Sequence, residues 1–200
     1  MKKYVLALFV FSALISCKDN PVSKKIRETK ETVSNTTNAV EEMTKMQDDL
    51  KELQETTPLT NEELKKWLPD EVNGMKRISF KAGQAGMMGI ASIEATYANE
   101  DKSKQFSISI IDGAGQIGAA ATTGIRMVMS QDFEEETENG FRKTVTKNST
   151  KAIEEYRSGS NYSSIQLLED NRFYLEAKGT NMDIDETWDA IDEIDMEKLG

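Results

Sequence analysis

The feature that most constrains the fold is a series of short segments in which apolar and polar residues alternate. In residues 90–98 the side chains of Ile93, Ala95 and Tyr97 point to one face of a strand, and polar residues point to the other. Residues 106–111 have the same period. Only a short charged loop separates the two segments, which predicts an antiparallel hairpin. Five further runs are strand-like, at residues 75–80, 140–146, 151–157, 163–168 and 172–179.

Helical patterns interrupt this series at three places. Thr60-Asn61-Glu62-Glu63 fits a capping box, and the helix that it begins ends before Pro69. Residues 115–131 and 185–194 repeat their apolar side chains at helical spacing. Strand runs with a few helices predict one α+β domain over residues 58–200. We expect a single, mostly antiparallel sheet of about six strands, flanked by helices.

A polar segment precedes this domain. Residues 18–57 contain no aromatic residue and no glycine, and Ile26, Val33 and Val40 recur at heptad spacing. The composition leaves two alternatives open. The segment is either a solvated helix over residues 24–55 that pairs with a partner helix, or a disordered stalk. In both cases it would act as a spacer.

The first residues of the chain are typical of a secretory signal. Lys2 and Lys3 precede an apolar run that ends in Leu14-Ile15-Ser16-Cys17, and this run is shorter than the roughly 20 residues of a membrane-spanning helix. The tetrapeptide resembles the lipobox of bacterial lipoproteins. The alternative is an ordinary signal peptide with an incidental cysteine.

The resemblance to lipoproteins implies a cellular location for the protein. Residues 1–16 would be removed as the signal peptide, and Cys17 would be lipidated as the first residue of a tether over residues 17–57. The lipid would hold the domain in the bacterial cell envelope, at an outer membrane, facing the periplasm or the cell surface. We therefore expect the membrane to be a partner through the N-terminal lipid.

The composition of the chain argues against several classes of function. Without residues 1–16 the chain has 23 basic and 35 acidic residues, so phosphate backbones would repel it and we expect no nucleic-acid partner. The absence of histidine removes the commonest general base and a common metal ligand. Cys17 is the only cysteine, so no intramolecular disulfide can form. We expect no enzymatic activity and no cofactor.

Residues 113–118, Gly-Ala-Gly-Gln-Ile-Gly, fit the G-x-G-x-x-G string of dinucleotide sites. That fingerprint requires a parallel βαβ unit and an acidic residue about 20 positions later, at the end of a strand. Here the flanking strands are predicted to form hairpins, and the acidic run at residues 132–136 is predicted to lie in a loop. We interpret the glycines as a tight connection from strand to helix.

Acidic residues near the C-terminus form a weak calcium candidate. Asp183, Asp185 and Asp189 have part of the spacing of a calcium-binding loop. The position that requires glycine holds Glu186, and a helix from residue 185 cannot wrap an ion. Capping and the helix dipole explain the same acids, so we expect no metal site.

A loop rich in glycine and methionine suggests an apolar ligand pocket. Methionine is an adaptable contact for apolar ligands, and residues 82–89 form a flexible loop between two strands. The candidate ligand-binding residues are Met87, Met88, Tyr97, Met127 and Tyr156. The alternative, which the apolar periodicity favours, is that these side chains belong to the core.

Together these observations predict a lipid-anchored, non-catalytic envelope protein whose globular domain binds a partner protein or a small ligand. The alternative is a structural or assembly lipoprotein that uses the 24–55 helix for oligomerisation or docking. Glu154 and Glu155 are the obvious pair for carboxylate chemistry. As neighbours on a strand, they point to opposite faces and cannot share a substrate.

Overall fold

The computed structural model describes residues 44–83 and 89–199 of the chain. Cys17, residues 18–43, Met87 and Met88 lie outside the described residues. Residues 44–55 are helical. A compact unit covers Gln47–Gly200, so the last residues of the predicted stalk belong to the domain.

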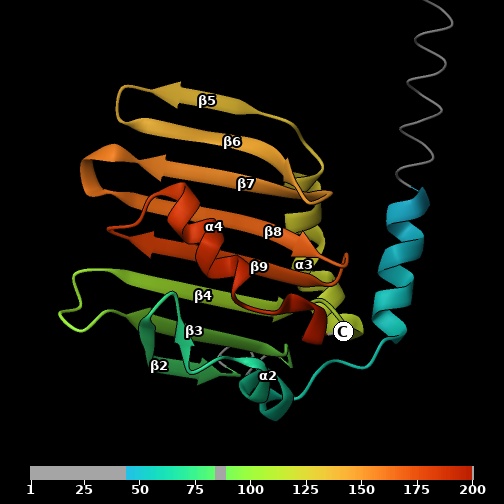
Figure 1. Ribbon diagram of the computed structural model, residues 1–200. Coiled ribbons are helices and arrows are strands. Elements are labelled where there is room, and N and C mark those ends of the chain that lie inside the picture. The colour runs from blue at the N-terminus through green and yellow to red at the C-terminus, as the bar shows by residue number, and fades with distance from the viewer. Residues whose placement is uncertain (1–43, 84–88, 200) are drawn as a thin grey trace, which may run out of the picture. The chain divides into compact units, whose positions relative to one another are not determined.

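Nine strands form one sheet, and Figure 1 shows it together with its helices. The strands are β1 (Glu71–Val72), β2 (Met75–Ala82), β3 (Ser92–Ala98), β4 (Gln105–Asp112), β5 (Glu134–Thr137), β6 (Gly140–Lys147), β7 (Thr150–Arg157), β8 (Tyr162–Glu169) and β9 (Phe173–Thr180). Besides the helix at residues 44–55, the helices of the described residues are α2 (Asn61–Trp67), α3 (Gly115–Met129) and α4 (Ile184–Asp192), with short 3-10 turns at Ser158–Ser160 and Met196–Leu199. None of the helices in the described residues is long and apolar enough to span a membrane.

The strand order is β1-β2-β3-β4-β9-β8-β7-β6-β5, and every neighbouring pair is antiparallel. The chain first builds β1 to β4 as consecutive neighbours. It then crosses through α3 to the far edge and returns strand by strand until β9 pairs with β4. The predicted α+β class and the antiparallel sheet are therefore confirmed.

The expected number of about six strands is wrong, because both edge strands give weak sequence signals. β1 has only two residues, too few for an alternating pattern. β5 has the sequence Glu-Glu-Glu-Thr, and all four residues are exposed. We predicted this acidic run as a loop. It forms a strand because its partner β6 supplies Lys143 and Arg142 opposite Glu134 and Glu135.

One face of the sheet carries the core. Its buried side chains include Ile93 and Tyr97 of β3, Ile108 of β4, and Leu175 of β9, and the register places them in continuous rows across the strands. Helices α2 and α4 cover this face (Figure 1). Trp188 of α4 packs into the same core cluster.

Helix α3 lies on the opposite face, against β7 and β8 (Figure 1). Lys151 is next to the inward-facing Ala152 and therefore points to the other face, where its Nζ donates to the carbonyl of Ser130 at the end of α3 (3.1 Å). Different helices thus cover the two faces of the sheet, and the candidate functional site lies on the face that α4 covers.

Candidate functional site

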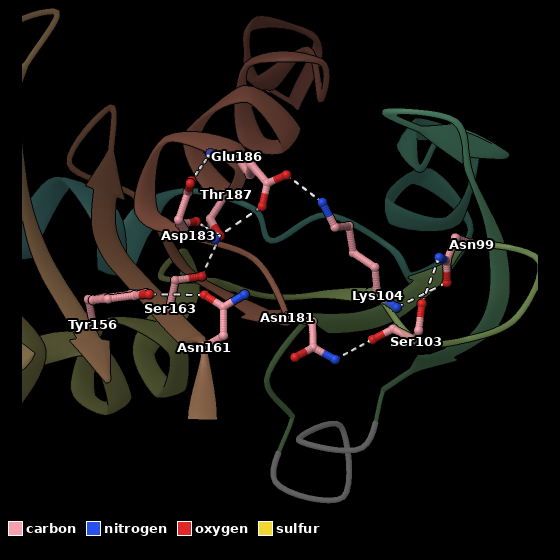
Figure 2. A network of polar contacts seen from close by, with 10 residues as sticks. All are labelled: Asn99, Ser103, Lys104, Tyr156, Asn161, Ser163, Asn181, Asp183, Glu186 and Thr187. Carbon is pink, nitrogen blue, oxygen red and sulfur yellow. Dashed lines mark hydrogen bonds and ion pairs between the residues drawn. The ribbon is translucent and has the colours of Figure 1, made fainter. Parts of the chain in front are cut away.

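A polar network at the start of α4 fixes this helix on the sheet (Figure 2). Asp183 caps the helix by accepting from the Glu186 N–H (2.8 Å), and Glu186 Oε2 accepts in return from the Asp183 N–H (3.1 Å). The hydroxyls of Ser163 on β8 and Thr187 lie 2.5 Å apart and are both buried. These contacts fix the start of α4 at Asp183 in the chain and against β8 in the sheet.

Gly179 of β9 allows the close approach of α4. A Cβ at this position would lie 2.4 Å from Ser163 Oγ, 2.6 Å from Met182 Cβ and 2.6 Å from Thr187 Oγ1. Such distances are far below van der Waals contact, so only glycine lets the helix start against the strand.

Side chains from neighbouring loops extend this network (Figure 2). Tyr156 donates its hydroxyl to Asn161 Oδ1 (3.0 Å), and Asn181 Nδ2 donates to the carbonyl of Ser103 (2.6 Å). Lys104 of the β3–β4 loop forms an ion pair with Glu186. The Lys104–Glu186 pair connects the first turn of α4 to the β3–β4 loop, and the Asn181 bond connects the residues just before the helix to the same loop.

An open pocket of about 350 Å³ lies between α4 and strands β6 and β7. Three elements line it, with the residues Val145, Thr146 and Lys147 from β6, Glu154 from β7, and Asp185, Trp188 and Asp189 from α4. The side chains combine one large aromatic ring with four charged groups. Charged and polar residues outnumber the two apolar ones, Val145 and Trp188, so the pocket suits a polar or charged ligand better than an apolar one.

Trp188 and Glu154 form the inner part of the pocket. They are 7% and 9% exposed, respectively. The indole Nε1 donates to Glu154 Oε1 (2.8 Å), which fixes the orientation of the ring. Lys143 Nζ lies 3.8 Å from Glu154 Oε2 and partly balances the buried carboxylate. The tryptophan is thus held by a defined partner rather than by packing alone.

Lys147 stands over the indole at the outer part of the pocket. Its Nζ lies 4.3 Å from the centroid of the Trp188 ring, within the range of a cation–π contact. The same ammonium pairs with Asp192 Oδ2 at 3.1 Å. One face of the tryptophan therefore already contacts a positive charge.

Comparison of the chain with family models, with curated proteins and with solved structures gives no match.

The structure does not bring together Tyr97, Met127 and Tyr156, the three predicted ligand-binding residues that it describes. Tyr97 is fully buried, its hydroxyl donates to the carbonyl of Pro69 (3.0 Å), and burial raises its pKa. Met127 is 57% exposed on α3, on the other side of the sheet. Tyr156 is half-buried and ends in the network of Figure 2. Neither Tyr97, Met127 nor Tyr156 lines the pocket.

The acids of the calcium candidate belong to the start of α4. Asp183 is its N-cap, and Asp185 lies in its first turn. Asp189 lies one turn later, and both Asp185 and Asp189 are exposed at the pocket. Among the described residues no group of acids, cysteines or histidines is arranged to hold a metal ion.

The glycines of residues 113–118 serve the packing of α3. A Cβ at Gly113 would lie 2.7 Å from the carbonyl of Arg172, and one at Gly118 would lie 2.6 Å from the carbonyl of Asp112. The strands before and after α3 belong to an antiparallel sheet, so no βαβ unit is present in the described residues.

Asp112 stabilises the connection between β4 and α3. Its buried carboxylate accepts two bonds from Arg172 (2.8 Å each) and one from each backbone N–H of Leu59 and Ala114. Burial alone would raise the pKa of Asp112, but these hydrogen bonds outweigh it and hold the pKa below its usual value.

Sequence reasoning named Glu154, Asp185 and Asp189 as separate candidates, but it did not bring them together with Trp188 and Lys147 in one pocket. Trp188 has the spacing of a core residue, which it also is, and Lys147 is one of many surface lysines. Glu154 gave the signal that could have been used. It falls between Ala152 and Tyr156, at an inward position of an alternating strand, where a carboxylate needs a partner.

Proposed function

We propose that this protein is a lipid-anchored, non-catalytic protein of the bacterial cell envelope whose domain binds a small ligand in the pocket between α4 and β6. The observation that carries the binding role is the paired Trp188 and Glu154 in an open pocket. A buried carboxylate is costly to keep, and Glu154 lies at the inner end of an open pocket, beside the indole of Trp188, which favours recognition over simple packing.

The chemistry of the pocket supports binding rather than catalysis. Glu154 is engaged by Trp188 and Lys143, and the other two carboxylates are exposed on α4. The chain has no histidine to act as a base. Its only cysteine lies in the sequence that resembles a lipobox, which supports anchoring through lipid.

The binding role is tested by native mass spectrometry of the full chain, isolated from the membranes of its host. We expect a reproducible extra mass on the wild type. The variant Asp189→Trp, which fills the pocket from an exposed position, should lose this mass. Glu62→Trp makes the same change at an exposed position of α2 and should retain it. A wild-type chain without any extra mass, or an extra mass that Asp189→Trp keeps, would contradict the proposal.

An assembly role through the 24–55 helix is the second candidate, because residues 44–55 are helical. Part of that helix serves the domain itself: Leu53 is 7% exposed, and Asp49 Oδ2 accepts from Asn171 Nδ2 (2.7 Å). The test is therefore a deletion of residues 18–43, which leaves these contacts intact. Light scattering would show a fall in oligomer size if assembly uses the deleted segment, and no change if it does not.

A further inference from the structure

The charges around the pocket indicate the class of ligand that it takes. Its lining has three carboxylates, those of Glu154, Asp185 and Asp189, and one ammonium, that of Lys147. Lys143 and Asp192, which pair with lining residues, add one charge of each sign. The pocket is therefore net negative, and it disfavours an anionic ligand.

The Trp188 ring adds a second preference for positive charge. The face of an indole attracts cations, and quaternary or primary ammonium groups bind in this way. In this structure the cation on the ring is the Lys147 ammonium, at 4.3 Å from the centroid. The chain thus supplies its own alkylammonium group at the place where aromatic ring and carboxylates converge.

Lys147 is held there by contacts that are easily exchanged. Its side chain is 34% exposed, and its ion-pair partner Asp192 is 53% exposed. Exposed ion pairs contribute little to stability, so the loss of its pairing with Asp192 costs Lys147 little. The lysine ends β6, directly before the tight turn at Asn148 and Ser149, both with positive φ. Its side chain can therefore swing towards solvent without a change in the sheet.

We propose that the pocket binds a ligand with an alkylammonium group, and that Lys147 occupies the position of this group until the ligand displaces it. This inference rests on the proposed ligand-binding function and names its chemical class. The incoming ammonium would lie on the Trp188 ring and would take over the pairing of Lys147 with Asp192, while Asp185 and Asp189, which also line the pocket, add negative charge around it. Glu154 would keep the indole in its orientation.

The test uses the full-length chain and n-butylammonium, which reproduces the side chain of Lys147. Trp67 is replaced by Phe so that Trp188 is the single tryptophan, since the chain has two, and excitation is set to exclude its five tyrosines. Circular dichroism checks the fold of this background, because Trp67 donates to the carbonyl of Asp195. The fluorescence of Trp188 is followed during titration at constant ionic strength. Two matched probes, n-butanol and butyrate, have the same chain without the positive charge.

We expect n-butylammonium to change the fluorescence in a saturable way. In Lys147→Met, which removes the competing ammonium, it should bind at least fivefold more tightly. In Asp185→Asn with Asp189→Asn it should bind at least fivefold more weakly. Lys151→Met changes a lysine on the other face of the sheet, which pairs with Asp132, and should leave the affinity unchanged.

Two outcomes would overturn the inference. One is that n-butanol or butyrate binds as well as n-butylammonium, which would show a pocket with a different ligand class. The other is that Lys147→Met binds n-butylammonium no better than the parent. Neither outcome removes an extra mass in the native mass spectrum, so failure of the ligand class can be distinguished from failure of the binding role.

Discussion

Close backbone contacts at single residues limit substitution in this domain. Gly179 lies where α4 meets the sheet, and a side chain there has no room. Gly124 lies on α3, and apart from its neighbours in the chain and the backbone of its own helix no atom lies within 4 Å of its ideal Cβ position. The two positions therefore differ in packing, although both hold glycine.

We expect Gly179→Ala to destabilise the domain by about 1–3 kcal/mol, because the methyl group must displace Ser163, Met182 or Thr187. Gly124→Ala is the control, and it should stabilise α3 by about 0.5–1 kcal/mol through helix propensity. Urea unfolding measures both. Equal effects of the two substitutions would show that the contacts at Gly179 relax freely.

Asp112 leads to a prediction about pH. Its pKa is lower in the folded state, so it stabilises the fold at pH values above its unfolded pKa of about 4. This contribution is lost as the pH falls through the folded pKa. We expect Asp112→Asn to cost about 3 kcal/mol at pH 7, because it leaves Arg172 without its buried partner. The difference from wild type should shrink below pH 4.

The control for this prediction is Glu155→Gln. Glu155 pairs with Arg157, which is 64% exposed, and exposed pairs contribute less than about 1 kcal/mol. Urea unfolding of the wild type and both variants at pH 7 and pH 3 gives four differences in the free energy of unfolding, one for each variant at each pH. A pH-independent cost for Asp112→Asn would mean that the carboxylate acts through shape and not through charge.

At the scale of elements, the ends of the helices are the best test of local sequence signals. Thr60 and Glu63 form the predicted capping box of α2, with Glu63 N–H donating to Thr60 Oγ1 (3.2 Å). In α4 the cap is Asp183, two residues before the predicted start. Both caps are local in sequence, and each satisfies backbone donors that the helix leaves free.

We expect Asp183→Ala to destabilise the domain by about 1 kcal/mol, because the N-cap hydrogen bond to Glu186 N–H is lost. Asp183→Asn keeps an acceptor oxygen and should recover most of this loss. The measurement is thermal unfolding of the three proteins. If Asn and Ala give equal midpoints, the capping bond does not contribute.

Most strands and helices could be predicted from the sequence, because alternation and helical spacing are local properties. Phe106, Ile108 and Ile110 indicated β4 directly, and all three are buried. The edge strand β5 could not be predicted, since its acidic residues become a strand only when basic β6 lies beside them. The pocket could not be predicted for the same reason. Trp188 contacts Glu154 only because α4 packs on β7, and local sequence patterns do not show this packing.

For the whole molecule, the proposed lipid anchor is tested at Cys17. We expect Cys17→Ser to move the full chain from the membrane fraction to the soluble fraction and to remove the mass of the acyl chains. Ser16→Ala retains a small residue before the cysteine and should leave both properties unchanged. Fractionation and intact mass provide the measurements. Persistent membrane association of Cys17→Ser would rule out the lipobox interpretation.

The central pairing of β4 with β9 has a consequence for how the chain folds. The first four strands can pair as consecutive neighbours, but the second edge of β4 has no partner until β9, the last strand, has been made. Pairing across such a sequence separation is slow, because a long loop must close first. During this interval the edge of β4 is open to other chains. We therefore expect aggregation of this protein to start from the half-folded chain, at a strand that the finished domain hides in its centre.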